Sequence, residues 1–114
     1  MTMARFAVLN RNGDFRALYH RGKTRVNAVL VTYVLKNRLG VPRVGITTGK
    51  KIGGAVQRNR CRRIIREAYR SLLPGIKGGW DMVFVARQRT LDVKSNQIKR
   101  VMEKQLISLG VLKP

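Results

Sequence analysis

Arginines recur at every fourth position between residues 58 and 70, and this spacing is the clearest chemical signal in the sequence. Arg58, Arg62, Arg66 and Arg70 share one side of a helix, because four residues make slightly more than one helical turn. Like charges at this spacing destabilise an isolated helix by about 0.2–0.5 kcal/mol per pair. A guanidinium group can instead grip two phosphate oxygens at once. The stripe therefore predicts phosphate binding. A charged face that only contacts solvent would contain several acidic residues among the basic ones, whereas Glu67 is the only acid here.

Further polar side chains widen this face. Asn59, Arg60 and Arg63 lie beside the stripe, and Lys50 and Lys51 precede it in a flexible loop that contains three glycines. Glycine allows close backbone approach, and a helix N-terminus offers free N–H groups to anions. A nucleotide-binding P-loop does not fit residues 45–51, because the segment is one residue too short and lysine replaces the Mg²⁺-binding hydroxyl. We therefore expect these residues to bind phosphate groups.

Aromatic side chains indicate which nucleic acid is bound. Phe15 and Tyr19 fall on one face of a predicted helix, and Tyr33 lies on a predicted strand. Aromatic rings near cations hold single-stranded RNA, at about 1–3 kcal/mol per stacked base. For Phe15, a core position and a ligand-facing position are equally compatible with the pattern. Trp80 opens a strand and is expected to be structural.

Protein-based catalysis has few candidate residues. His20 is the only histidine, and five acids are spread along the chain, so no cluster has metal-ligand spacing. A nucleophilic pair of Cys61 and His20 stays open, although the apolar stripe around Cys61 favours a buried thiol. We expect no catalytic residue and no metal ligand in this chain. Any chemistry is expected to come from a partner.

The charge balance points to a polyanionic partner. Within 114 residues, 25 lysines and arginines oppose 5 acids, which gives a net charge of +20. Self-repulsion on this scale destabilises the fold unless a polyanion neutralises it, and nucleic acid is the commonest one. With no long apolar run and no secretory signal, we expect neither a membrane partner nor export. A lone cysteine suits the cytoplasm.

The remaining sequence predicts the elements that position these residues. Residues 1–114 read as one domain, with residues 1–11 as a loose basic leader. Asn12 caps a helix over 13–21, and Gly22 ends it as a left-handed residue. Later elements, in chain order, are strands at 23–26, 29–35 and 43–48, a helix at 55–73, a buried strand at 80–87, and a helix from Asp92 or Ser95 to Leu109 stopped by Gly110.

This order, α-β-β-β-α-β-α, predicts an α+β two-layer sandwich with a four-stranded mixed sheet. The strand at 29–35 is apolar on both faces and should lie inside the sheet. Two helices carry apolar stripes that must pack on it. The stripes comprise Cys61, Ile64, Ile65, Ala68 and Leu72 in the first helix, and Ile98, Val101, Met102, Leu106 and Leu109 in the second.

The segment from Ala55 to Arg70, AVQRNRCRRIIREAYR, closely resembles the signature helix of the bacterial ribonuclease P protein family, A-V-x-R-N-R-x-K-R-x-x-R-E-x-F-R. Flanking pieces agree in order: Asp14-Phe15 with Tyr19, Arg43-Val44-Gly45-Ile46 before Lys50-Lys51, and Asp81 to Arg87. The resemblance covers residues 12–109. Departures are mild: Gly49 replaces Ser, Arg62 replaces Lys, Tyr19 replaces Phe, and Gly54, where Lys or Asn is common, could cost one phosphate contact.

The resemblance implies a subunit of a ribozyme that removes the 5′ leader of precursor tRNA, with the RNA subunit performing Mg²⁺-dependent hydrolysis. It implies that the arginine helix contacts the catalytic RNA, that Phe15, Tyr19 and Tyr33 face the leader, and that no small molecule is the substrate. It also implies a fold of the ribosomal protein S5 domain 2 type with a left-handed β-α-β crossover, an exception to the usual hand. A structural or ribosomal RNA-binding protein is the main alternative; a helical DNA-binding module and a stand-alone nuclease fit less well.

Overall fold

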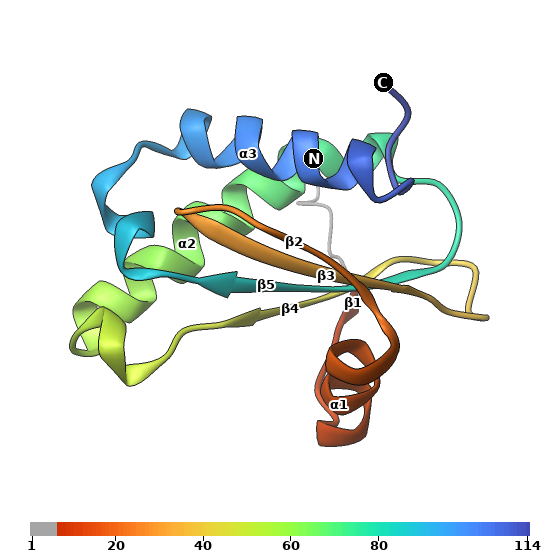
Figure 1. The fold of residues 1–114 in the computed structure, drawn as a ribbon, viewed down its shortest axis with the longest axis horizontal. Coiled ribbons are helices and arrows are strands. Elements are labelled where there is room, and N and C mark those ends of the chain that lie inside the picture. Colours follow the sequence, from red (N-terminus) through yellow and green to blue (C-terminus); the bar gives the residue numbers. More distant parts are fainter. Residues whose placement is uncertain (1–6) are drawn as a thin grey trace, which may run out of the picture.

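A computed structural model describes residues 7–114 and shows one mixed sheet with helices on both faces (Figure 1). The α+β class and the predicted order of the main elements are confirmed. The elements in chain order are β1 (Ala7–Val8), α1 (Asn12–Arg21), β2 (Lys23–Val26), β3 (Leu30–Lys36), β4 (Arg43–Thr47), α2 (Ala55–Leu72), β5 (Trp80–Ala86) and α3 (Ser95–Ser108), with short 3₁₀ helices at Lys50–Ile52, Leu73–Gly75 and Gln88–Asp92.

The strands lie in the order β1-β4-β5-β3-β2. β3 is antiparallel to both of its neighbours, so its predicted interior position is confirmed. β4 and β5 are parallel neighbours, and α2 is the crossover that joins them. The left hand of this crossover stays a prediction.

The sheet has five strands rather than four because β1 pairs in parallel with β4. This strand falls within the segment predicted to be a loose leader, of which residues 1–6 lie outside the described part of the chain. The amide of Leu9 donates to the Val44 carbonyl at 2.9 Å, and the Leu9 side chain is buried. A two-residue strand is too short to leave an alternating pattern in the sequence.

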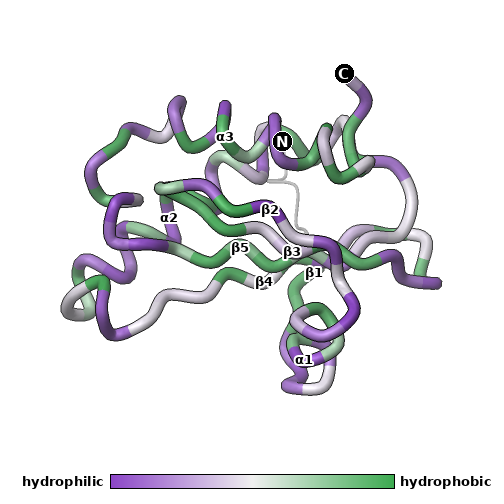
Figure 2. The backbone as a smooth tube through the Cα atoms, viewed as in Figure 1, coloured by the Kyte–Doolittle hydropathy of each residue, from purple (hydrophilic) through white to green (hydrophobic). Residues whose placement is uncertain are grey.

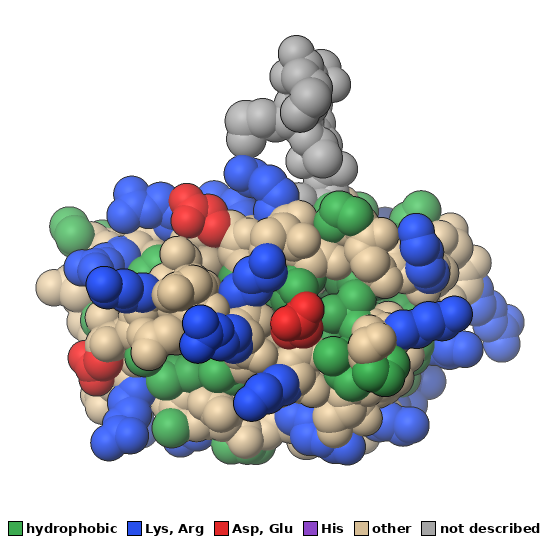
Figure 3. Space-filling view, turned by 90° about the horizontal axis from the view of Figure 1, so that it is seen from above, with side chains coloured by type: hydrophobic (Ala, Val, Ile, Leu, Met, Phe, Trp, Pro, Cys, Tyr) green, Lys and Arg blue, Asp and Glu red, His purple; other side chains and the backbone are tan. Residues whose placement is uncertain are grey.

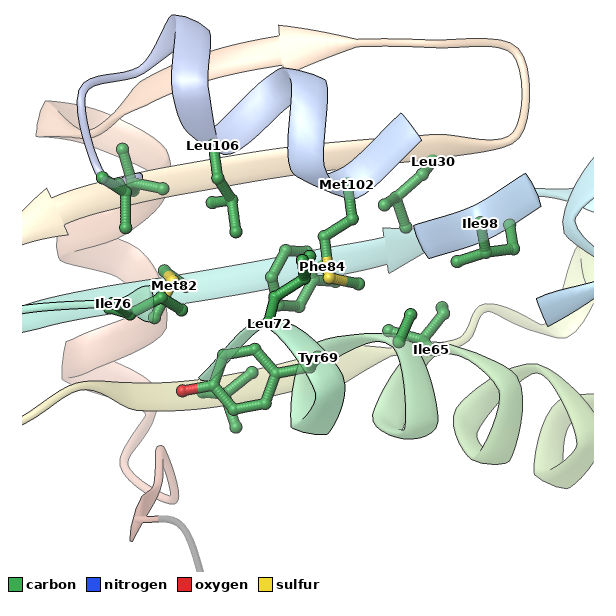
Figure 4. Packing of buried hydrophobic residues seen from close by; sticks show 14 of the residues in the cluster. Leu30, Ile65, Tyr69, Leu72, Ile76, Met82, Phe84, Ile98, Met102 and Leu106 are labelled. Atoms are coloured by element: carbon green, nitrogen blue, oxygen red, sulfur yellow. The ribbon is translucent and has the colours of Figure 1, made fainter. Parts of the chain in front are cut away.

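The main core lies between the sheet and the layer of α2 and α3. Figure 4 shows Ile65, Tyr69 and Leu72 of α2 and Ile98, Met102 and Leu106 of α3 converging on the strands. Burial in β3 alternates residue by residue, so one face of this strand meets the helices. Both predicted stripes are confirmed, except that Val101 is only half-buried, and Tyr69 joins the α2 stripe. In the tube of Figure 2, the long hydrophobic stretches of the sheet lie in β3 and β5.

Helix α1 lies against the opposite face of the sheet (Figure 1). Leu18 packs there with Leu9 and Val83 in a second, smaller core cluster that Phe15 and Tyr33 border. The two-layer prediction thus holds for the α2–α3 side, and α1 adds partial cover on the other. The part of this face that α1 leaves open is available to a ligand.

Three local predictions were wrong. Asn12 does not cap the first helix: it is the first residue of α1, Arg11 occupies the N-cap position, and no side chain caps this end. Gly22 is extended, with φ −72° and ψ 156°, and is not left-handed. Glycine is needed there for space, because a Cβ would lie 2.5 Å from the Leu18 carbonyl oxygen. Neither Asp92 nor Ser95 caps the last helix: Asp92 ends a 3₁₀ helix, Ser95 is the first residue of α3, and Lys94 occupies the N-cap position. Among the described residues, no helix combines the length and apolar character that crossing a bilayer requires.

Candidate nucleic-acid interface

The arginines of α2 have no acidic partners in the part of the chain that the structure describes. There, Arg43 is the only residue whose cationic group lies within 4.0 Å of a carboxylate. Arg58 donates to the Gly53 carbonyl at 3.1 Å, and Arg62 makes a long 3.4 Å contact with the Asn59 side-chain oxygen. The Nε of Arg70 is buried without a hydrogen-bond partner. The positive charge of the helix is therefore available to an external anion.

Residues of four elements surround a groove of about 190 Å³ beside α2. Arg62 and Arg66 form its cationic wall, and Phe15 of α1 lies opposite across the edge of β4. The remaining lining is apolar: Val8, Leu9, Val44, Gly45 and Ile46. The structure thus brings together residues from both predicted sets, the RNA-binding helix and the aromatic cleft. Such a groove suits a single-stranded nucleic acid, because its phosphates can pair with the cations while its bases stack on the aromatic ring.

Gly45 sets the depth of this groove. A Cβ at this position would lie 2.7 Å from both Cε1 and Cζ of Phe15, closer than carbon atoms approach each other. The ring therefore lies directly on the backbone of β4. Phe15 is half-buried, so it occupies both of the positions that the sequence left open, one in the core and one facing a ligand. One part of the ring packs on β4, and the rest lines the groove.

A polar network holds α1 to the edge of the sheet. Arg43 donates two hydrogen bonds to Asp81, at 2.9 and 2.7 Å, and lies 3.5 Å from the carboxylate of Asp14. Asn37 donates a further bond to Asp81 at 2.8 Å. Hydrogen bonding to Asp81 raises the pKa of Arg43 above its ordinary value. Since Asp14 precedes Phe15 on α1, this network positions the aromatic wall of the groove.

Tyr19 and Tyr33 meet edge to face on the sheet surface next to α1, with ring centroids 4.9 Å apart and planes at 84°. Tyr33 also lines a second, broad hollow of about 1080 Å³ on this face. Its floor includes Val31 and Val85, and its rim carries Lys50 and Lys51. Predicted aromatic and basic residues are again brought together. The groove and this hollow therefore give the sheet face two apolar regions, each bordered by cations.

Other predicted residues are placed away from the groove. Asn59, Arg60 and Arg63 are exposed on α2. Two residues of helix turn by about 200°, so Arg60 and Arg62 lie on opposite flanks of the helix with buried Cys61 between them. The helix therefore presents cations in two directions.

A Cys61–His20 pair is not formed. The Cys61 side chain is fully buried under α2, while His20 is exposed on α1 across the sheet. Burial raises the pKa of the Cys61 thiol, which opposes a nucleophilic role. Among the described residues, no three His, Cys, Asp or Glu side chains come together as a metal-binding cluster.

Sequence reasoning missed several residues of the interface. Val8 and Leu9 complete the groove, but nothing in the pattern of residues 1–11 indicated it. Arg87, Gln88 and Arg89 line the second hollow beside Lys51. The two arginines could have been found, because Arg87 is the last residue of the buried strand that was predicted at 80–87 and Arg89 lies two residues beyond it.

Comparison with known proteins agrees with this geometry. Residues 3–110 match the family described as Ribonuclease P. The ribonuclease P protein component of Clostridioides difficile is 45% identical over 93 residues, covering 81% of this chain and 82% of the relative. That of Dehalococcoides mccartyi is 39% identical over 104 residues, covering 91% and 85%. The solved RNase P protein of Staphylococcus aureus is 31% identical and superposes with a TM-score of 0.84, covering 96% of this chain and all of that one.

Proposed function

The chain belongs to the bacterial ribonuclease P protein family and is a subunit of this tRNA-processing enzyme, and from this premise we propose how its surface is divided between two RNAs. Arg62, Arg66 and Phe15 hold the single-stranded 5′ leader of precursor tRNA in the groove. The opposite flank of α2, with Arg60 and Arg63, binds the RNA subunit with which the protein works. The observation that carries the proposal is the groove that joins unpaired arginines to an aromatic ring.

The leader continues along the sheet face in this proposal. Tyr33 and the apolar floor of the second hollow contact bases, while Lys50 and Lys51 pair with phosphates. Tyr19 supports Tyr33 through their edge-to-face contact. Arg58 and Asn59 lie near the N-terminal end of α2, where we propose that they contact the RNA subunit, and Arg70 extends the same basic face.

The chain's part in the reaction is electrostatic and positional. Two RNAs repel each other when they approach within a Debye length, about 8 Å at physiological salt. A protein with a net charge of +20 between them screens this repulsion, so the leader binds tighter and less Mg²⁺ is required. We assign the hydrolysis and its Mg²⁺ to the RNA subunit, and the place of the reaction to the bacterial cytoplasm.

The first experiment measures cleavage of a precursor tRNA by a bacterial ribonuclease P RNA at low Mg²⁺, with and without this protein. We expect cleavage only when the protein is present. Affinity for precursor tRNA should exceed that for mature tRNA, because only the precursor carries a leader. No stimulation despite tight RNA binding would favour the alternative, a structural RNA-binding protein.

A pair of variants tests the division of α2. Arg62→Glu should abolish the affinity advantage of precursor over mature tRNA. Arg60→Glu should weaken assembly with the RNA subunit and leave that advantage in place. Arg100→Glu, an exposed site on α3, is the matched control for one reversed charge. Equal effects of the first two substitutions on both measurements would contradict the division.

A further inference from the structure

A separate hollow of about 830 Å³ opens at the end of the molecule where α2 and α3 both terminate. Its apolar lining consists of Leu72, Trp80, Val111 and Leu112. It shares no lining residue with the groove beside α2 or with the hollow around Tyr33. The proposed leader path therefore does not use it.

Four lysines from four segments surround this hollow, and they face one acid among its lining residues. They are Lys36, Lys77, Lys99 and Lys113, and the acid is Glu103. In the described part of the chain, none of the four lies within ion-pair distance of a carboxylate. The Lys36 ammonium lies 5.7 Å from the centroid of the Trp80 ring. Four cations around one hollow repel one another, so an anionic occupant lowers their repulsion.

The apolar lining narrows the chemistry of that occupant. Trp80 and Leu112 are each only half-buried, and Trp80 packs against the main core, which fixes its ring. An inorganic anion would satisfy the lysines and leave this apolar surface in water. A nucleotide satisfies both, because its base is flat and apolar on its faces and its phosphate is anionic.

We propose that this hollow binds an unpaired nucleotide of an RNA chain, with its phosphates paired to the lysines and its base against Trp80 and Leu112. The site is a third RNA contact, and its lining includes Ser71 and Leu72 at the C-terminal end of α2, opposite to the end that carries Arg58. It extends the RNA-binding role of the protein. It does not depend on how the arginines of α2 are divided between RNAs.

The sequence supplies its own probe, because Trp80 is the only tryptophan. The full chain is titrated with a 5′-phosphorylated hexaribonucleotide while tryptophan emission is recorded. The background is the double variant Arg62→Glu and Arg66→Glu, which removes the cationic wall of the groove. We expect a saturable change in emission. Adding Lys77→Ala and Lys99→Ala should raise the dissociation constant by roughly fivefold, as expected for exposed ion pairs.

Three controls decide the outcome. Lys94→Ala with Lys104→Ala removes two exposed lysines elsewhere on the chain and should leave the titration unchanged. An abasic ribose-phosphate hexamer should bind more weakly than the hexaribonucleotide. Equal binding, or an equal response to inorganic phosphate, would show a site for anions alone and overturn the proposal. Unchanged emission would also overturn it, and so would a dissociation constant that the Lys77 and Lys99 substitutions do not alter.

Discussion

Gly45 decides how the aromatic wall of the groove is placed. Its missing side chain lets the Phe15 ring lie on β4, since a Cβ there would lie 2.7 Å from two ring carbons. We predict that Gly45→Ala displaces the ring and reduces the affinity advantage of precursor over mature tRNA by about tenfold, the value of one stacked base. Gly13→Ala on the same helix as Phe15 is the matched control, because no atom lies within 4 Å of its Cβ position. A leader-dependent affinity that survives Gly45→Ala would remove Phe15 from the binding site.

Cys61 links stability to alkaline pH. Burial raises the pKa of its thiol, and the nearby Arg60 opposes this more weakly. The folded protein therefore holds the proton after the unfolded chain has released it, and the stabilisation is lost as pH rises above about 8.5, the thiol pKa in an unfolded chain. We predict that Cys61→Ala, although less stable at neutral pH, loses less unfolding free energy between about pH 8 and pH 10. Denaturant unfolding of the original protein and of Cys61→Ala at both pH values measures this difference in unfolding free energy. An equal loss of unfolding free energy in the two proteins would contradict the prediction.

At the residue scale, sequence reasoning found side chains with a strong signature of type and spacing. The arginines of α2 and the ring of Phe15 belong to this group. It did not find Leu9, because one apolar residue in a basic segment has no periodic partner. It also misjudged Gly22, since a glycine needed for close packing looks the same in a sequence as one needed for a left-handed turn.

Gln105 fixes α3 on the sheet through a network that hydrophobic patterning did not predict. Its side-chain oxygen accepts a 2.6 Å hydrogen bond from the Thr32 hydroxyl, and its nitrogen donates to the Leu30 carbonyl at 3.0 Å. Both side chains are buried. We predict that Gln105→Ala lowers the free energy of unfolding by about 1–3 kcal/mol, because Thr32 is left unsatisfied. Thermal unfolding of Gln105→Ala, of Thr32→Val and of the double variant measures the coupling energy between the two side chains. Additive losses of stability would contradict a direct hydrogen bond between them.

At the element scale, long periodic segments were predicted closely. The arginine helix begins at Ala55 as expected and ends at Leu72, one residue early, where a 3₁₀ turn takes over. Elements without periodicity were missed, such as β1 and the 3₁₀ helix Gln88–Asp92. Their stability comes from tertiary contacts, for example the Thr90 hydroxyl that donates to the Val29 carbonyl at 2.6 Å.

The whole molecule carries a large excess of positive charge on its surface. Figure 3 shows one face, seen from above the view of Figure 1, on which blue lysines and arginines far outnumber red acids. Repulsion among these groups destabilises the compact state, and salt screens it. We predict that the melting temperature rises between about 20 and 500 mM NaCl. Replacing Lys99, Arg100 and Lys104 with Gln should make this rise smaller, and a melting temperature that is independent of salt in both proteins would contradict the argument.

The arginine helix is the only connection between the two parallel strands β4 and β5 in the middle of the sheet. That pairing joins strands that are distant in the sequence, and α2 lies in the connection between them. An RNA that holds α2 therefore stabilises the sheet as well, and free chains open more often than bound ones. Proteases in the cell act on open chains, so unbound protein is removed faster. We therefore expect the RNA-bound protein to resist protease digestion longer than the free protein.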